Sequence, residues 1–125
     1  MNLLLDTHTL LWWLADDARL SARARDLISD PVNQVAVSAV SGWEIAIKQS
    51  LGKLDVDPNR VLEEVQNNGF EQLHVSFKHG LAAGALPAHH RDPFDRMLIA
   101  QAQCERLRLL SIDGVFSGYD VEVVW

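Results

Sequence analysis

The sequence contains one cysteine, no long hydrophobic run and no excess of basic residues. With Cys104 alone, no internal disulfide can form, which fits a reducing compartment such as the cytoplasm. The longest uninterrupted apolar run, Leu10 to Ala15, is far shorter than the roughly 20 residues that a membrane-spanning helix needs. We also expect no signal peptide, because Asp6 interrupts the first apolar stretch and no basic segment precedes it. The sequence therefore predicts a cytoplasmic protein without a membrane anchor.

The shortage of lysine and arginine bears on nucleic acid as a partner. The chain has 11 basic and 17 acidic residues, a formal net charge of −6, whereas phosphate binding depends mainly on lysine and arginine. If four of the acidic residues form a metal site, 13 acidic residues remain against 11 basic ones. Composition therefore leaves a nucleic-acid partner open without favouring it.

The chain contains enough apolar side chain for one packed domain. Of its 125 residues 48% are hydrophobic, and four are tryptophan. This length is close to the commonest domain size and allows a single hydrophobic core. No internal repeat, low-complexity tract or linker divides the sequence, so we expect one domain over residues 1–125.

Short apolar strands are predicted to alternate with helices along almost the whole chain. The expected strands cover residues 2–5, 34–37, 71–75, 108–112 and 121–124. The expected helices cover residues 7–15, 22–28, a segment around 43–48 that stops near 52, 58–67, 77–83 and 93–105, with a loop over 84–91. Ser21, Asp57, Ser76 and Asp92 are the expected N-caps. This alternation is typical of a parallel sheet covered by helices on both faces.

Four carboxylates occur where a strand ends or early in a helix. Asp6 and Asp113 each follow a predicted strand, and Glu44 and Asp95 lie early in helices that begin on the same side of the sheet. Carboxylates that border a core are unfavourable unless a cation, hydrogen bonds or a metal ion compensates them. Ligands of open parallel sheets bind beyond the carboxyl ends of the strands. We therefore expect the four to converge on an oxygen-only site suited to Mg²⁺ or Mn²⁺.

Each of these carboxylates also has a purely structural explanation. The alternatives are Asp6 as an N-cap, Asp95 in a capping arrangement with Asp92, Glu44 as the partner of Lys48, and Asp113 as a turn residue. Thr7 and Ser111 are small hydroxyls able to orient the carboxylates or a water molecule, and they are equally suited to a cap and a strand end. Taken together on one sheet edge, the four acidic residues favour a metal site.

Four ordered blocks of sequence carry a family resemblance. They are Leu5-Asp6-Thr7-His8; Val37-Ser38-Ala39 with residues 43–48 and 51–54; residues 91–102; and Leu110-Ser111-Ile112-Asp113. These blocks span nearly the whole length of the chain. They resemble PIN domains, and specifically the VapC-type ribonuclease toxins of bacterial type II toxin–antitoxin systems.

The resemblance implies a three-layer α/β/α sandwich with a central parallel sheet. It also implies a Mg²⁺- or Mn²⁺-dependent endoribonuclease that forms a homodimer and is inhibited by a small cognate antitoxin, whose tail would fill the carboxylate cleft. The acidic positions of the family fall on Asp6, Glu44, Asp95 and Asp113. Asp92 is a further acidic residue of the subfamily pattern, and we interpret it as an N-cap first and a neighbour of the metal site second.

Three basic residues lie close in sequence to the acidic ones. Lys48, Arg91 and Arg96 are candidates for contacts with RNA phosphates, although pairing with the carboxylates explains them at least as well. The five histidines and one cysteine lack the spacing of a zinc site, and residues 89–91 are expected to form a solvated loop.

Two other classes of function compete with a nuclease. One is a non-catalytic PIN-like module that only binds a partner or RNA, for which four carboxylates would not be needed. The other is an aspartate-based phosphotransfer domain. Residues 6–9, Asp-Thr-His-Thr, lack the second aspartate that a phosphatase of the haloacid dehalogenase type needs two residues after the first.

Overall fold

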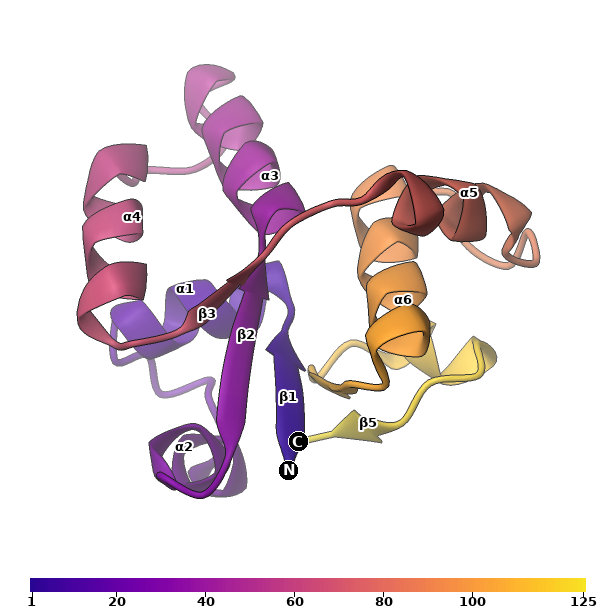
Figure 1. Cartoon of the computed structure of the whole chain (residues 1–125). Coiled ribbons are helices and arrows are strands. Elements are labelled where there is room, and N and C mark those ends of the chain that lie inside the picture. Colours follow the sequence, from indigo (N-terminus) through magenta and orange to yellow (C-terminus); the bar gives the residue numbers. More distant parts are fainter.

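Five parallel strands form a single sheet in the order β3-β2-β1-β4-β5 (Figure 1). The computed structural model describes residues 1–125. The strands are β1 (Asn2–Leu5), β2 (Gln34–Ser38), β3 (Glu71–Leu73), β4 (Arg108–Leu110) and β5 (Val123–Val124). All neighbouring pairs are parallel. The predicted parallel sheet is confirmed.

Six α-helices and one short 3₁₀ helix connect the strands. They are α1 (Thr7–Leu14), α2 (Ala22–Ser29), α3 (Ala39–Ser50), α4 (Pro58–Asn67), α5 (Phe77–Ala85), α6 (Pro93–Glu105) and η1 (Gly114–Gly118). The four predicted N-caps are confirmed, because each side chain accepts a hydrogen bond from the first turn of its helix. None of these helices is long and apolar enough to cross a membrane.

The hydrophobic core lies on both faces of the sheet. Leu3 and Leu5 pack on one face in a cluster with buried residues of α1, α2 and α4, whereas Leu4 packs on the other face with residues of α6 and η1. Alternate side chains of a strand point to opposite faces, so one strand supplies both cores. The three-layer α/β/α architecture is confirmed.

The structure corrects several element boundaries. Helix α3 begins at Ala39, earlier than expected, because Ser38 at the end of β2 caps it directly. Helix α5 extends to Ala85, so the predicted loop over residues 84–91 is wrong at its first two positions. The edge strands β3 and β5 are shorter than predicted, since an edge strand has a partner on one side only. Strand β4 ends at Leu110, two residues earlier than predicted, and Asp113 begins the turn of η1, which agrees with the structural alternative given for this residue.

Candidate active site

Asp6 lies at the junction of β1 and α1 and is buried, with 7% of its surface exposed. Its Oδ1 accepts a hydrogen bond from the backbone N–H of Thr9 at 2.7 Å, so the predicted N-cap role is present. Its Oδ2 accepts a hydrogen bond from the hydroxyl of Ser111, which follows β4. Because β1 and β4 are neighbours, Asp6 is held across two strand ends.

Glu44 reaches the same region from α3 and is also buried, with 5% exposed. The Thr7 hydroxyl donates to its Oε1 at 2.6 Å and lies 2.9 Å from the Ser41 hydroxyl. The Lys48 ammonium binds Oε2 at 2.6 Å, as the spacing of four residues predicted. This hydrogen bond raises the pKa of Lys48, so the ammonium stays charged beside the site.

Asp95 enters from the first turn of α6 and carries an unfavourable charge. Burial raises its pKa above the usual value, and the negative charges of Asp92 and Glu44 raise it further. A hydrogen bond with His90 acts in the opposite direction, with Nε2 and Oδ2 2.8 Å apart. Asp92 and Glu44 therefore lie close enough to Asp95 to disfavour its ionised form.

Asp92 caps α6 and also lies beside Asp95. Its Oδ1 accepts hydrogen bonds from the backbone N–H groups of Phe94 at 2.8 Å and Asp95 at 3.2 Å. Single donor atoms of His90, Asp92 and Asp95 all lie within 4.8 Å of one another. The two interpretations offered for Asp92, a cap and a neighbour of a metal site, are thus compatible in one side chain.

Asp113 is the least enclosed of the four predicted carboxylates. Its backbone N–H donates to Ser111 Oγ at 3.0 Å, and that hydroxyl binds Asp6 in turn. Its own carboxylate is exposed and accepts a hydrogen bond from Val115 N at 3.0 Å, which caps η1. The structure ties the backbone of Asp113 to the site and leaves its carboxylate at the solvent side.

Arg96 has a structural task that the sequence did not predict. Its guanidinium donates to four backbone carbonyls, those of Ala83, Leu86, Pro87 and His90, at 2.9–3.1 Å. It therefore fastens the segment before α6 to the helix, and an RNA contact is not supported for it. Arg91 remains exposed, and Lys48 is 38% exposed beside Glu44.

His90 is the residue of the site that sequence reasoning missed. Residues 89–91 form a loop, as expected, with His89 and Arg91 exposed. Within this loop His90 binds Asp95, and the His89 ring packs against Tyr119 at 5.4 Å. The available signal was the position of His90 two residues before the cap Asp92. A cap fixes the direction in which the chain enters a helix, so residues just before it can fold back over the first turn.

Comparisons with known proteins identify the family. The PIN domain family model matches residues 3–122. The chain belongs to the PIN domain family. Ribonuclease VapC22 of Mycobacterium tuberculosis is 30% identical over 115 residues, which cover 90% of this chain and 87% of that protein. The chain is thus a VapC-type ribonuclease toxin, a hydrolase of phosphodiester bonds.

Solved structures show the same fold for this VapC-type toxin. VapBC2 from Rickettsia felis, bound to a promoter DNA fragment, superimposes with a TM-score of 0.76 at 16% identity, over 99% of this chain and 98% of that chain. FitAcB from Neisseria gonorrhoeae superimposes with a TM-score of 0.69 at 20% identity, over 98% of this chain and 96% of that chain. VapBC-5 from Mycobacterium tuberculosis superimposes with a TM-score of 0.67 at 22% identity, over 98% of this chain and 97% of that chain.

PIN-domain nucleases are metal-dependent, and the donor atoms of this toxin fit a divalent cation. Asp92 and Asp95 bring carboxylate oxygens close together, and hard cations prefer such oxygen donors. The pKa of Asp95 is raised mainly by burial, and repulsion from the negative charges of Asp92 and Glu44 adds to this effect. A bound dication would remove that repulsion.

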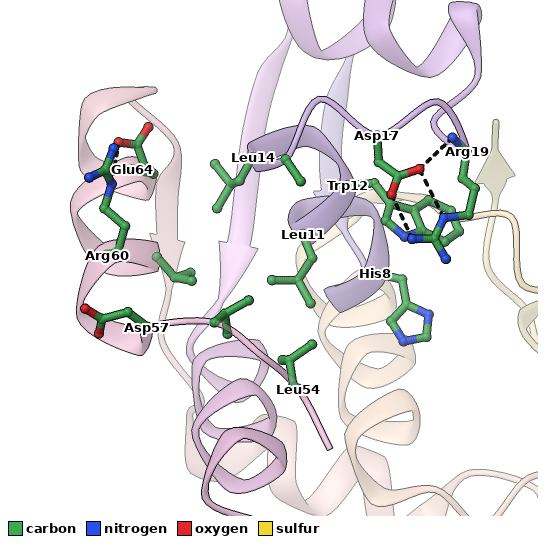
Figure 2. A pocket seen from close by; sticks show the side chains of 13 residues that line it. His8, Leu11, Trp12, Leu14, Asp17, Arg19, Leu54, Asp57, Arg60 and Glu64 are labelled. Carbon is green, nitrogen blue, oxygen red and sulfur yellow. Dashed lines mark hydrogen bonds and ion pairs between the residues drawn. The ribbon is translucent and has the colours of Figure 1, made fainter. Parts of the chain in front are cut away.

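A second feature of the toxin is a groove of about 670 Å³ between α1 and α4 (Figure 2). Leu11 and Leu54 point into it from opposite sides, and more than half of its lining residues are hydrophobic. Two ion pairs lie along it, Arg19 with Asp17 at 2.7 Å and Arg60 with Glu64 at 3.2 Å. The groove thus combines a largely apolar lining with two internal ion pairs and the carboxylate of Asp57.

Proposed function

We propose that this toxin is a Mg²⁺-dependent endoribonuclease whose metal is held by Asp6, Glu44, Asp95 and Asp113, with Mn²⁺ able to replace Mg²⁺. The observation that carries the proposal is the gathering of acidic side chains around Asp95, which lies beside Asp92 and whose pKa is raised mainly by burial and further by Asp92 and Glu44. Such an arrangement lowers the stability of the fold and is expected where a cation belongs.

The bound ion would activate water and stabilise the negative charge on the leaving oxygen, which leaves a 5′-phosphate and a 3′-hydroxyl. The chain's own residues orient the carboxylates. Ser111 and Thr7 donate to Asp6 and Glu44, so neither acidic side chain is free to rotate. Exposed Arg91 is our candidate for a phosphate contact, together with the ammonium of Lys48. RNA as the substrate and the lone cysteine favour the cytoplasm.

The decisive experiment is RNA cleavage by the Asp6→Asn variant. Asparagine can still accept the N-cap hydrogen bond, so the variant should fold normally while losing the charge that a metal needs. We expect metal-dependent cleavage of total RNA to be abolished, with circular dichroism unchanged. Asp26→Asn, on an exposed position of α2, is the matched control and should cleave like the wild type.

Full metal-dependent cleavage by Asp6→Asn would overturn the assignment of the site. The competing function, a non-catalytic PIN-like binding module, predicts that the purified wild type neither cleaves RNA nor binds Mn²⁺ in calorimetry. The same two measurements therefore separate a misplaced site from a missing activity.

The proposed protein partner is a small antitoxin. Structural relatives include VapBC2 of Rickettsia felis and a toxin–antitoxin complex from Klebsiella pneumoniae. The groove between α1 and α4 suits an amphipathic helix, since more than half of its lining residues are hydrophobic and four of its charged side chains form two ion pairs. Leu11→Glu should prevent binding of a cognate antitoxin, while exposed Val32→Glu should not. Equal binding by both folded variants would exclude the groove.

We also propose that two copies of the toxin associate through α5. Phe77 and Leu81 lie one helical turn apart on this helix and are 86% and 65% exposed. Replacing both with glutamate should convert a dimer into a monomer in light scattering. A monomeric wild type, or a double variant that remains dimeric, would exclude this interface.

A further inference from the structure

The imidazole of His90 brings a nitrogen donor into an otherwise oxygen-rich site. Its Nε2 lies 2.8 Å from Asp95 Oδ2, and single donor atoms of His90, Asp92 and Asp95 lie within 4.8 Å of one another. The imidazole is 28% exposed, so solvent and dissolved ions can reach it. The proposed carboxylate ligands do not explain why an imidazole nitrogen lies beside them.

The spacing of these atoms suits ligands of one ion. Around an octahedral cation with bonds of about 2.1 Å, neighbouring donors are about 3.0 Å apart and opposite donors about 4.2 Å apart. The contact between His90 and Asp95 falls near the first value. The 4.8 Å limit on the group that includes Asp92 is compatible with the second.

The position of His90 is supported by contacts outside the site. The Arg96 guanidinium donates to the His90 carbonyl at 3.1 Å and to that of Pro87 at 3.0 Å. The Tyr119 hydroxyl donates to the same Pro87 carbonyl at 3.1 Å. The backbone before α6 is thus held from two sides, and a ligand held in this way needs little reorganisation on binding.

We propose that His90 is a direct ligand of the metal and that it raises the affinity of this centre for Mn²⁺, the ion that can replace Mg²⁺, relative to its affinity for Mg²⁺. The inference rests on the proposed function, because it assumes that Asp95 holds the ion. Mg²⁺ is bound almost entirely by oxygen, whereas an imidazole nitrogen binds first-row transition ions better. His90 therefore shifts the selectivity of a site that four carboxylates alone would leave to Mg²⁺.

Pulsed EPR of Mn²⁺ bound to the wild-type protein tests the ligand directly. A coordinated imidazole gives a ¹⁴N coupling, and labelling histidine with ¹⁵N should replace it with a ¹⁵N coupling. This measurement requires no variant. His90→Ala should lose the coupling, while His89→Ala, the adjacent imidazole that packs on Tyr119, should keep it.

Calorimetry gives the second readout. His90→Ala should weaken Mn²⁺ binding by about 10- to 100-fold and change Mg²⁺ binding much less, whereas His89→Ala should change neither. Mn²⁺ binding without nitrogen coupling, or an unchanged preference in folded His90→Ala, would overturn the role of His90 and leave the proposed function intact. A wild type that binds neither ion would overturn the proposed function itself.

Discussion

Three of the four acidic side chains proposed for the site are held in place by other side chains. Asp6 accepts a hydroxyl hydrogen bond, Glu44 accepts a hydroxyl and an ammonium, and Asp95 binds an imidazole. Hydrogen bonds to ionised groups are stronger than those between neutral groups, so these contacts fix geometry as well as charge. The site is therefore oriented before any cation binds.

At Asp95 we expect a conflict between stability and function. The pKa of Asp95 is higher in the folded protein than in the unfolded chain. The folded state is therefore more stable when Asp95 is protonated, and this stability is present below the unfolded pKa and lost as the pH rises through the folded pKa. Asp95→Asn removes the ionised group. In metal-free protein its melting temperature should exceed that of the wild type at pH 7, by a margin that shrinks toward pH 4.

Thermal unfolding by circular dichroism between these two pH values checks this prediction, with EDTA present throughout. A difference in melting temperature that stays constant with pH would mean that the charge of Asp95 is not the cause.

At the scale of secondary-structure elements, the start of α6 combines capping with acidity. The Asp92 carboxylate binds two backbone N–H groups of the first turn. Asp92→Ala should destabilise the protein by about 1 kcal/mol, whereas Asp92→Asn should retain the cap and the stability. Because only the charge is lost, Asp92→Asn should still weaken Mn²⁺ binding. Urea denaturation and calorimetry measure the two effects, and unchanged Mn²⁺ affinity would limit Asp92 to capping.

The segment between α5 and α6 depends on one guanidinium. Arg96 donates to four carbonyls of this segment, a geometry that a single lysine ammonium cannot reproduce. Arg96→Lys and Arg96→Met should both speed hydrogen exchange of residues 84–91. Arg108→Met, which removes a surface pair with Glu122, is the control and should leave that exchange unchanged. Slow exchange in both Arg96 variants would show that other contacts hold the segment.

At the scale of the whole molecule, the proposed metal ligands come from distant parts of the chain. Asp6 directly follows β1, Glu44 lies in α3, and Asp95 lies in the first turn of α6. An unfolded chain therefore does not hold these three residues together. A cation that binds only the folded state stabilises it by about 2.7 kcal/mol at 100 times its dissociation constant. Mn²⁺ should raise the melting temperature of the wild type, EDTA should reverse the rise, and Asp6→Asn should show little of it. An equal rise in that variant would place the bound ion elsewhere.

The helix starts were predicted correctly where they depend on neighbouring residues in the sequence. The strand lengths were predicted wrongly where they depend on pairing with another strand. Asp57 and Asp92 stand directly before a proline and cap their helices as expected, because a cap depends on a few neighbouring residues. The lengths of β3 and β5 were overestimated, since an edge strand extends only as far as its single neighbour pairs with it.

The sequence by itself determined the alternation of strands and helices, the family and the four acidic positions. These depend on residue type, periodicity and order along the chain. Only the tertiary structure decided which groups surround each carboxylate. Binding of His90 to Asp95, and of Arg96 to the carbonyls before α6, results from how that segment folds back over the helix. Such contacts depend on distances in space, which residue types and their spacing do not specify.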